Sequence, residues 1–241
     1  MNPVIGDIVR REAAVMGLAL TNREIEYFEI YAAELKKWNL KFNLTSIVRD
    51  DEIAIKHFID SLHLVSFLKE EDVLLDIGSG AGLPVIPLKI VRPAVEMVSV
   101  DAVEKKVSFQ RHVVRMLRLQ KMETVSSRVE QLNTTCQKKF SLIVSRAFSQ
   151  LDRFVSIALP LLADNGRLIA MKGAAADDEI EAVGSVLQSV GVSIEDVQRY
   201  TLPQSMGERV MITIKVGQAP LNKGAEGVVA KLLFKGLLAA G

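Results

Sequence analysis

The residues with the clearest chemical potential lie in one short stretch, VLLDIGSGAGLPVIPLKIV, at residues 73–91. An apolar run ends at Asp76, and glycines follow at Gly78, Gly80 and Gly82. Glycine lacks a Cβ, so its backbone can approach a ligand closely and adopt positive φ. An apolar strand, a glycine-rich turn and a helix start, in that order, are typical of a doubly wound α/β sheet, which binds ligands beyond the carboxyl ends of its strands. The stretch therefore predicts a ligand site at this turn.

The spacing argues against two common nucleotide sites. The dinucleotide fingerprint G-x-G-x-x-G, counted from Gly78, requires glycine at position 83, which is Leu83. No lysine and Ser/Thr pair completes a triphosphate loop. Asp101 follows about 20 residues after the turn, where such sheets place a carboxylate that accepts ribose hydroxyls; it could also cap the next helix. Together these features resemble the S-adenosylmethionine site of Rossmann-like methyltransferases.

The pattern of apolar residues divides the chain near residue 70. Before that point it is helical, with Thr21 and Glu24 in capping-box spacing and the acidic residues 50–52 at the start of a second helix. After it, short apolar strands alternate with helices, which favours parallel strands with right-handed crossovers. The predicted strands lie near residues 73–78, 96–101, 122–127, 140–146 and 166–173, and those near 195–202 and 208–216 are expected to form an antiparallel edge.

The expected fold class is α/β: a Rossmann-like, S-adenosylmethionine-dependent methyltransferase with a mostly parallel sheet, an antiparallel edge and an N-terminal helical extension. We assign residues 1–70 to the extension, 71–217 to the methyltransferase domain and 218–241 to a C-terminal tail of unknown role. The 241 residues suffice for one such domain with a small extension. No apolar run approaches the roughly 20 residues of a membrane-spanning helix. The start has no secretion signal and Cys136 is the single cysteine, so we expect a cytoplasmic protein. We also predict that it is a monomer.

Seven segments in order carry a narrower resemblance. The chain is similar to the RsmG/GidB family of bacterial methyltransferases, which modify guanine N7 in small-subunit ribosomal RNA. The segments are KWNLKFNLTSI, KHFIDSL, DIGSGAGLPVIPL, SRVEQL, SRAF, MKG and GERVMITIKV, between residues 37 and 216. The resemblance implies S-adenosylmethionine as cofactor, no metal, small-subunit RNA or the small ribosomal subunit as partner, and the guanine at position 527 of 16S ribosomal RNA as acceptor. Val85 departs from the glycine that often follows Leu-Pro or Phe-Pro in relatives, and the tail is longer than the pattern.

The resemblance also implies cofactor contacts, carried over by position to Gly78, Leu83, Val129, Glu130 and Arg146. Each has a structural alternative. Glu130 could form a capping box with Ser127 and merely start a helix. Arg146 ends the fourth predicted strand, where a guanidinium could position the cofactor carboxylate or the RNA, or lie in solvent. Lys172 ends the fifth predicted strand and could face phosphate or water.

Missing motifs narrow the chemistry. Methyltransferases that act on an exocyclic amine commonly carry an Asn/Asp-Pro-Pro-aromatic motif after the fourth strand, where this chain has SRAF at residues 145–148. Pyrimidine C5 methylation requires a cysteine nucleophile, and Cys136 lies in a polar stretch without a motif. Guanine N7 offers an unprotonated in-plane lone pair and needs no general base. We therefore name no catalytic proton-transfer residue.

Basic residues indicate where RNA could bind. Between residues 105 and 121 the chain has six Lys or Arg residues and no acid, and Arg111, Arg115 and Arg118 share one helical face. Such a stripe could neutralise phosphates, or could be an ordinary solvated face. Lys56, His57 and Lys172 are further candidates for RNA contact.

Two functions from other classes stay open at this point. One is a non-catalytic RNA-binding or ribosome-assembly factor on the same fold, which methyl incorporation would exclude. The other is a nicotinamide-dependent oxidoreductase, which Leu83 disfavours.

Overall fold

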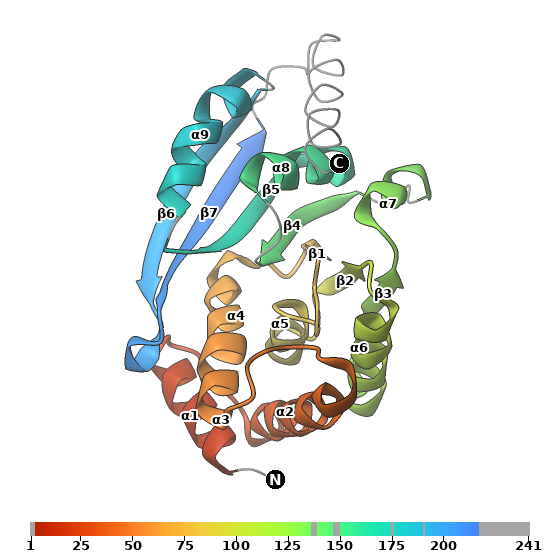
Figure 1. Ribbon diagram of the computed structural model, residues 1–241, viewed down its shortest axis with the longest axis vertical. Coiled ribbons are helices and arrows are strands. Elements are labelled where there is room, and N and C mark those ends of the chain that lie inside the picture. The colour runs from red at the N-terminus through yellow and green to blue at the C-terminus, as the bar shows by residue number, and fades with distance from the viewer. Residues whose placement is uncertain (1–2, 136–138, 147–149, 175, 190, 217–241) are drawn as a thin grey trace.

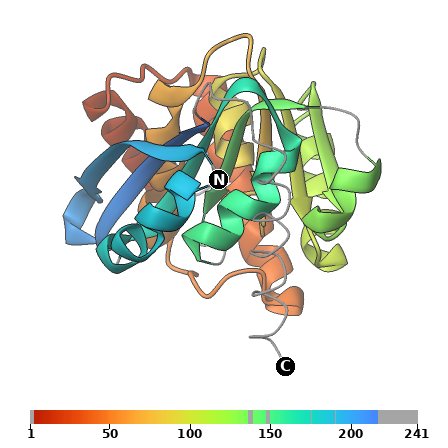
Figure 2. The same cartoon turned by 90° about the horizontal axis from the view of Figure 1, so that it is seen from above.

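The computed structural model describes residues 3–135, 139–146, 150–174, 176–189 and 191–216. Cys136, part of the SRAF segment and the tail at 218–241 lie outside these ranges. The described chain is built on a seven-stranded sheet with helices on both faces (Figures 1 and 2).

The sheet has the strand order β3-β2-β1-β4-β5-β7-β6. Strands β1 to β5 pair in parallel, whereas β7 pairs antiparallel with both β5 and β6. The predicted parallel sheet with an antiparallel edge is confirmed. Because β1 lies between β2 and β4, the strand order reverses next to β1, where such sheets bind ligands. The strands are β1 Val73–Ile77, β2 Glu96–Asp101, β3 Met122–Ser126, β4 Phe140–Arg146, β5 Leu162–Gly173, β6 Val192–Thr201 and β7 Glu208–Val216.

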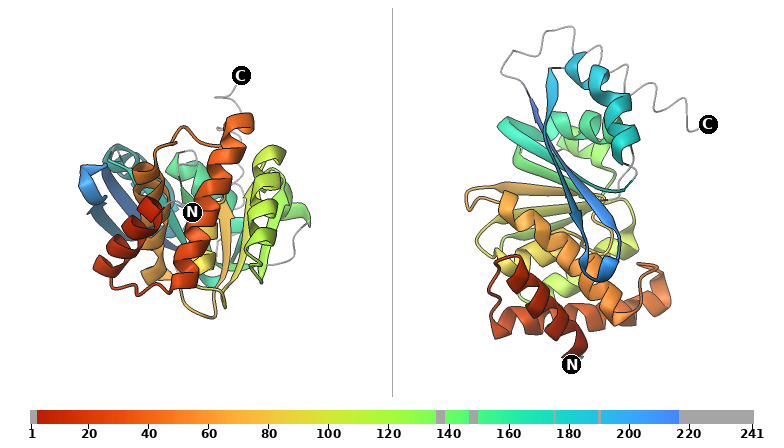
Figure 3. Two further views of the ribbon diagram at one scale, coloured as in Figure 1. Left: turned by 90° about the horizontal axis from the view of Figure 1, so that it is seen from below. Right: turned by 90° about the vertical axis from the view of Figure 1, so that its left-hand side faces the viewer.

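The N-terminal helices cover one face of the sheet together with α5 and α6, and α7, α8 and α9 lie on the other (Figure 3). The first face carries α1 Pro3–Val15, α2 Asn22–Phe42, α3 Asp50–Glu52, a π-helical turn Ile53–Ile59, α4 Asp60–Leu62, α5 Val85–Val91 and α6 Glu104–Met116. The second carries α7 Val129–Thr135, α8 Leu151–Ala158 and α9 Ala176–Ser189. Phe28 and Phe58 belong to the same hydrophobic cluster as Leu74 and Leu142 of the strands. The N-terminal helices therefore form one layer of the shared core.

The helical predictions hold at the positions where capping chemistry suggested them. Thr21 and Glu24 form the expected capping box at the start of α2. The second predicted helix begins at Asp50 and contains the π-helical turn that carries Lys56 and His57. Helix α1 is not among the predicted elements. Its apolar positions Ile5, Ile8, Val9 and Ala13, all buried, have helical spacing and could have identified it.

One buried hydrogen bond connects the N-terminal layer to the glycine-rich turn. The Tyr31 hydroxyl, on α2, donates to the Ala81 carbonyl oxygen at 2.7 Å. The ring stacks on Phe58 and Phe109, with centroid distances of 5.2 and 6.1 Å. Burial raises the pKa of the Tyr31 hydroxyl, so it remains a donor throughout the physiological range.

We expect Tyr31→Phe to destabilise the protein by about 1–2 kcal/mol, because the buried Ala81 carbonyl loses its donor. The measurement is urea unfolding. Tyr27→Phe is the matched control, since Tyr27 lies on the same helix and its hydroxyl accepts, among the described residues, only an exposed hydrogen bond from Arg23. Equal effects of the two substitutions would contradict a specific role for the Tyr31 hydroxyl.

Candidate active site: two clefts at the carboxyl ends of the strands

The turn between β1 and α5 has a backbone that requires glycine. Gly80 has φ of +57°, and a Cβ built on it would meet no other atom within 4 Å. At Gly82, φ is +92° and a Cβ would lie 2.4 Å from Ile86 Cδ1. Gly80 therefore borders open space in which a ligand can approach the backbone, whereas Gly82 allows α5 to pack closely beneath the turn.

A buried polar network fixes this turn. The Gln110 side chain, fully buried on α6, donates from Nε2 to Ser79 Oγ and to the Gly80 carbonyl oxygen, both at 2.8 Å. Its Oε1 accepts from the Ser99 hydroxyl at 2.5 Å. The amide groups of Gly78 and Ser79 donate to the Val100 carbonyl oxygen. Sequence reasoning missed Gln110, although a glutamine on the otherwise apolar stripe of this helix was a usable signal.

Asp101 closes the network at the end of β2. Its Oδ2 accepts from the Gly80 amide at 2.8 Å and its Oδ1 from the Val103 amide at 2.9 Å. The second bond closes a local turn before α6; it is not the helix cap that the sequence left open, because the N-cap of α6 is Val103 and no side chain caps it. An ionised carboxylate has about four lone-pair sites, so these two bonds leave capacity for ribose hydroxyls.

The first cleft, of about 520 Å³, opens beside this network. It brings together Gly78, Asp101, Val129 and Glu130 of the predicted cofactor residues, and Lys106, Arg128 and Arg153 also line it. Glu130 pairs with Arg153 at 3.6 Å, while the Ser127 hydroxyl bonds Gln131 Oε1 at 3.0 Å. Gly80 lies in the adjoining turn. Leu83 is buried in the hydrophobic core beneath the turn.

Asp76 is buried between the two sides of the site, and its pKa responds to both Asp101 and Arg146. Its Oδ2 accepts from the Val85 amide at 3.4 Å, and its Oδ1 has no hydrogen-bond partner among the described residues. Burial raises the pKa of this carboxyl well above its usual value. The free oxygen fits a cationic or hydrogen-bonding group of a ligand at the turn.

The second cleft, of about 450 Å³, lies on the other side of the switch point. It unites Arg146, expected among the cofactor contacts, with the RNA candidates Lys56, His57 and Lys172. Asp60, Glu179 and Arg209 also line it. Lys172 pairs with Glu179 at 2.7 Å, and the same carboxylate oxygen accepts from the Leu151 amide. This arrangement separates Arg146 from the residues of the first cleft.

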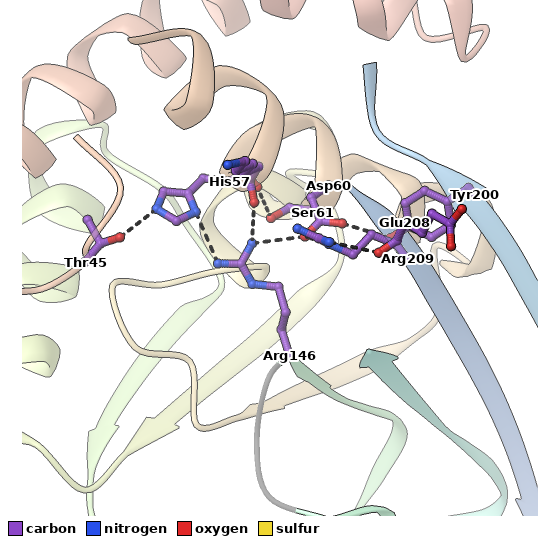
Figure 4. Close-up of polar contacts among 9 residues, drawn as sticks. Thr45, His57, Asp60, Ser61, Arg146, Tyr200, Glu208 and Arg209 are labelled. Atoms are coloured by element: carbon purple, nitrogen blue, oxygen red, sulfur yellow. Dashed lines mark hydrogen bonds and ion pairs between the residues drawn. The ribbon is translucent and has the colours of Figure 1, made fainter. Parts of the chain in front are cut away.

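Arg146 holds His57 in a defined state (Figure 4). Arg146 Nη1 donates to the Lys56 carbonyl oxygen at 3.1 Å, and Nη2 lies 3.4 Å from His57 Nδ1. His57 Nε2 lies 3.0 Å from Thr45 Oγ1. Burial and the Arg146 charge lower the pKa of His57 to about 3. The imidazole is therefore neutral at physiological pH, and the geometry assigns its proton to Nε2, with Nδ1 accepting from Arg146.

Asp60 and Arg209 of the second cleft are residues that sequence reasoning missed. They belong to KHFIDSL and GERVMITIKV, two of the segments that carry the family resemblance, and this was a signal that could have identified them. Their spacing gave no sign of contact, because Asp60 begins α4 whereas Arg209 lies on β7. The sheet order brings them together.

The arginines of the predicted basic stripe lie away from the two clefts. Arg111 pairs with Glu104 at 2.9 Å near the start of the helix. Arg115 lies in the last turn of the helix. The prediction that Arg118 shares this helical face is wrong, because α6 ends at Met116 and Arg118 follows it with a φ of +52°. Beyond it, the Lys121 carbonyl oxygen accepts from the Met97 amide at the amino-terminal end of β2. All three arginines are exposed. The stripe thus runs away from the clefts, and RNA binding along it stays a prediction.

The strand order, the glycine turn at the switch point and the carboxylate ending β2 define a Rossmann-like methyltransferase. Solved structures share the fold. The ribosomal protein L11 methylase from Lactobacillus delbrueckii subsp. bulgaricus matches with a TM-score of 0.53 and 14% identity, over 68% of this chain and 79% of that one. P. horikoshii TYW2, solved in complex with MeSAdo, matches with a TM-score of 0.53 and 12% identity, over 68% and 63%.

Sequence relatives identify the family. The GidB family, described as rRNA small subunit methyltransferase G, matches residues 24–206. Proteins named ribosomal RNA small subunit methyltransferase G are 44% identical in Geobacter sulfurreducens and 46% identical in Geotalea uraniireducens. These alignments cover 86% and 89% of this chain and 95% and 98% of the relatives. The chain belongs to this family and is an S-adenosylmethionine-dependent ribosomal RNA methyltransferase, as the sequence predicted.

We expect Asp101→Ala to weaken binding of S-adenosylhomocysteine by about 1–3 kcal/mol. The variant would lose the charge-assisted hydrogen bonds to the ribose hydroxyls and the hydrogen bond from the Gly80 amide that fixes the turn. Calorimetric titration measures the affinity, and circular dichroism verifies the fold. Glu123→Ala is the control, because Glu123 is an exposed acid on the neighbouring strand β3. Unchanged affinity in a folded Asp101 variant would remove this carboxylate from the site.

We expect Asp76→Asn to weaken binding of S-adenosylhomocysteine and to stabilise the fold by an amount that increases with pH. The folded-state pKa of Asp76 is raised, so ionisation destabilises the native state increasingly as pH rises above the unfolded value of about 4. The variant should therefore gain more stability relative to wild type at pH 8 than at pH 5, while binding S-adenosylhomocysteine more weakly. Urea midpoints at the two pH values test this. A variant less stable at pH 8 than at pH 5, relative to wild type, would contradict it.

Proposed function

We propose that the enzyme transfers a methyl group from S-adenosylmethionine to N7 of a guanine in 16S ribosomal RNA, at position 527 by family resemblance. The observation that best supports this proposal is the second cleft, whose described lining offers cations and no side chain available as a proton acceptor. The His57 lone pair at Nδ1 faces Arg146, and its low pKa makes it a weak base. The carboxylates of Asp60 and Glu179 are engaged by arginine, tyrosine, lysine and backbone donors.

The first cleft supports a site for the cofactor nucleoside. Asp101 would accept the ribose hydroxyls, with Gly78, Gly80, Val129 and Glu130 around it. The free Oδ1 of Asp76 fits the amino group at the other end of the cofactor. Leu83 supports the turn from the core. When bound, the cofactor supplies an electrophilic methyl group on a sulfonium.

The second cleft would receive the acceptor. Lys56, His57 and Lys172 line it, and Arg146 lies where β4 ends. The N7 lone pair would attack the methyl carbon while the carbon–sulfur bond breaks, with the neutral thioether as leaving group, and no proton would have to leave the base. The protein's contribution is then to hold the two reactants in line and to exclude water.

Three finer features belong to the same proposal. We infer that the protein acts as a cytoplasmic monomer on small-subunit RNA and needs no membrane. Among the described residues, no helix is long and apolar enough to cross a bilayer. Light scattering after gel filtration would test the monomer. Methyl incorporation into small subunits would distinguish the enzyme from a non-catalytic assembly factor.

The chemistry itself is tested with 7-deazaguanine at the target position of the substrate RNA. This RNA should bind nearly as well as the guanine form yet accept no methyl, because one ring atom loses its lone pair while the Watson–Crick edge is unchanged. Binding is measured by filter retention and transfer by labelled methyl. Methyl transfer to the 7-deaza base would move the acceptor to another atom.

The same mechanism predicts the pH dependence. Because no proton leaves before attack, and because His57 stays neutral, the single-turnover rate should show no rising limb between about pH 6 and 8. Rapid-quench measurements at saturating RNA and saturating cofactor test this, with the affinities for both measured at each pH as the control. A tenfold rise per pH unit would require a general base.

A further inference from the structure

We propose that Asp60 is a positioning residue which holds Arg146 and Arg209 together as a seat for one phosphate of the acceptor RNA in the second cleft. The inference deepens the proposed function, because it assigns a specific RNA contact to the cleft that would receive the acceptor.

Asp60 is the centre of the cluster in Figure 4. Its side chain is 4% exposed, and its Oδ2 lies 3.5 Å from Arg146 Nη1 and 3.5 Å from Arg209 Nε. Its Oδ1 accepts from the Tyr200 hydroxyl at 2.9 Å. A single buried carboxylate from α4 therefore joins guanidinium groups from β4 and β7 and a phenol from β6.

The two arginines keep donors available after these contacts. A guanidinium has five N–H groups. Beyond Asp60, Arg146 contacts the Lys56 carbonyl oxygen and His57, and Arg209 donates from Nη1 to the Glu208 carbonyl oxygen. Their side chains are 17% and 25% exposed, and both line the cleft. Remaining donors on adjacent guanidinium groups match the oxygens of a phosphate.

The charge of the lining favours an anion. Lys56, Arg146, Lys172 and Arg209 provide four cations, whereas Asp60 and Glu179 are the carboxylates among the described lining residues. Lys56 pairs with Glu52 at 2.6 Å and Lys172 with Glu179 at 2.7 Å, so the excess of positive charge lies on the two arginines that share Asp60. Asp60 lowers the mutual repulsion of the two arginines without neutralising both. The cleft retains positive charge, and an RNA phosphate would balance it.

A second buried pair in this protein shows what a purely structural contact looks like. Asp72 and Arg167 form a two-point pair, at 2.6 and 3.2 Å, near the amino ends of the strands. Arg167 also donates to the Phe67 carbonyl oxygen, and Asp72 accepts from Ser141 and the Lys69 amide. Neither residue lines either cleft. The Asp60 contacts are longer and open to a cleft, as a ligand site requires.

The test measures binding of a fluorescent 16S ribosomal RNA transcript to the full chain across a salt series, and binding of S-adenosylhomocysteine by calorimetry. Arg209→Gln should weaken RNA binding about tenfold and reduce the slope of log affinity against log salt by about 1. Arg209→Lys should recover the slope, because it restores the charge. Asp60→Asn should raise KM for RNA more than it lowers kcat. Cofactor affinity should be unchanged in all three.

Asp72→Asn is the matched control, because it perturbs a buried arginine pair remote from the clefts; it should lower the thermal midpoint and leave the salt slope intact. Weaker S-adenosylhomocysteine binding by Arg209→Gln with an unchanged RNA slope would assign the seat to the cofactor carboxylate and overturn the proposal. Unchanged affinities for both ligands would also overturn it. RNA affinity is measured without methyl transfer, so failure of the N7 mechanism would not affect this result.

Discussion

The backbone of the glycine turn has positive φ angles. The geometry of the rest of the site depends on the side chains that fix this turn. Positive φ at Gly80 and Gly82 is favoured by the absence of a Cβ, and at Gly82 a Cβ would also clash with Ile86, but glycine alone would leave the turn mobile. Three side chains from three elements remove that freedom: Asp101 from β2, Gln110 from α6 and Tyr31 from α2. Because Tyr31 lies in the N-terminal layer, that layer supports the cofactor cleft as well as the core. The family match, which begins at residue 24, includes this helix.

Charge divides the site into two halves around Asp76. On one side, Asp101 and the turn present hydrogen-bonding groups suited to a nucleoside. On the other, Arg146 and its neighbours form a cationic cleft suited to RNA. Burial raises the pKa of Asp76, and the charges of Arg146 and Asp101 act on this pKa in opposite directions. A buried carboxyl that lacks a partner on one oxygen costs stability. Its retention here is consistent with a cationic group of the ligand as the missing partner.

Much of the fold followed from local patterns, whereas the composition of the clefts did not. Alternating apolar strands and helices predicted the parallel sheet, and the capping box located α2, because these features are encoded by near neighbours. The glycine turn and Asp101 were predicted from spacing and lie together as expected. Arg146 was grouped with the first-cleft residues, yet it lines the second cleft. Asp60 and Arg209 were missed because 149 positions separate them in the numbering and only the antiparallel edge brings β7 beside β5. The basic stripe of α6 has helical periodicity, but that period says nothing about which end of the helix faces the site.

The central claim of the proposal is that the cofactor and the RNA occupy separate clefts, with the buried Asp76 coupled electrostatically to Asp101 of the first and Arg146 of the second. A crystal structure of the complex with S-adenosylhomocysteine tests it most directly. The account predicts the adenosine in the first cleft, with Asp101 on the ribose hydroxyls and the amino group beside Asp76, and no ligand density between Arg146 and Arg209. Adenosine density in the second cleft, among Lys56, His57 and Arg209, would contradict the division of the site.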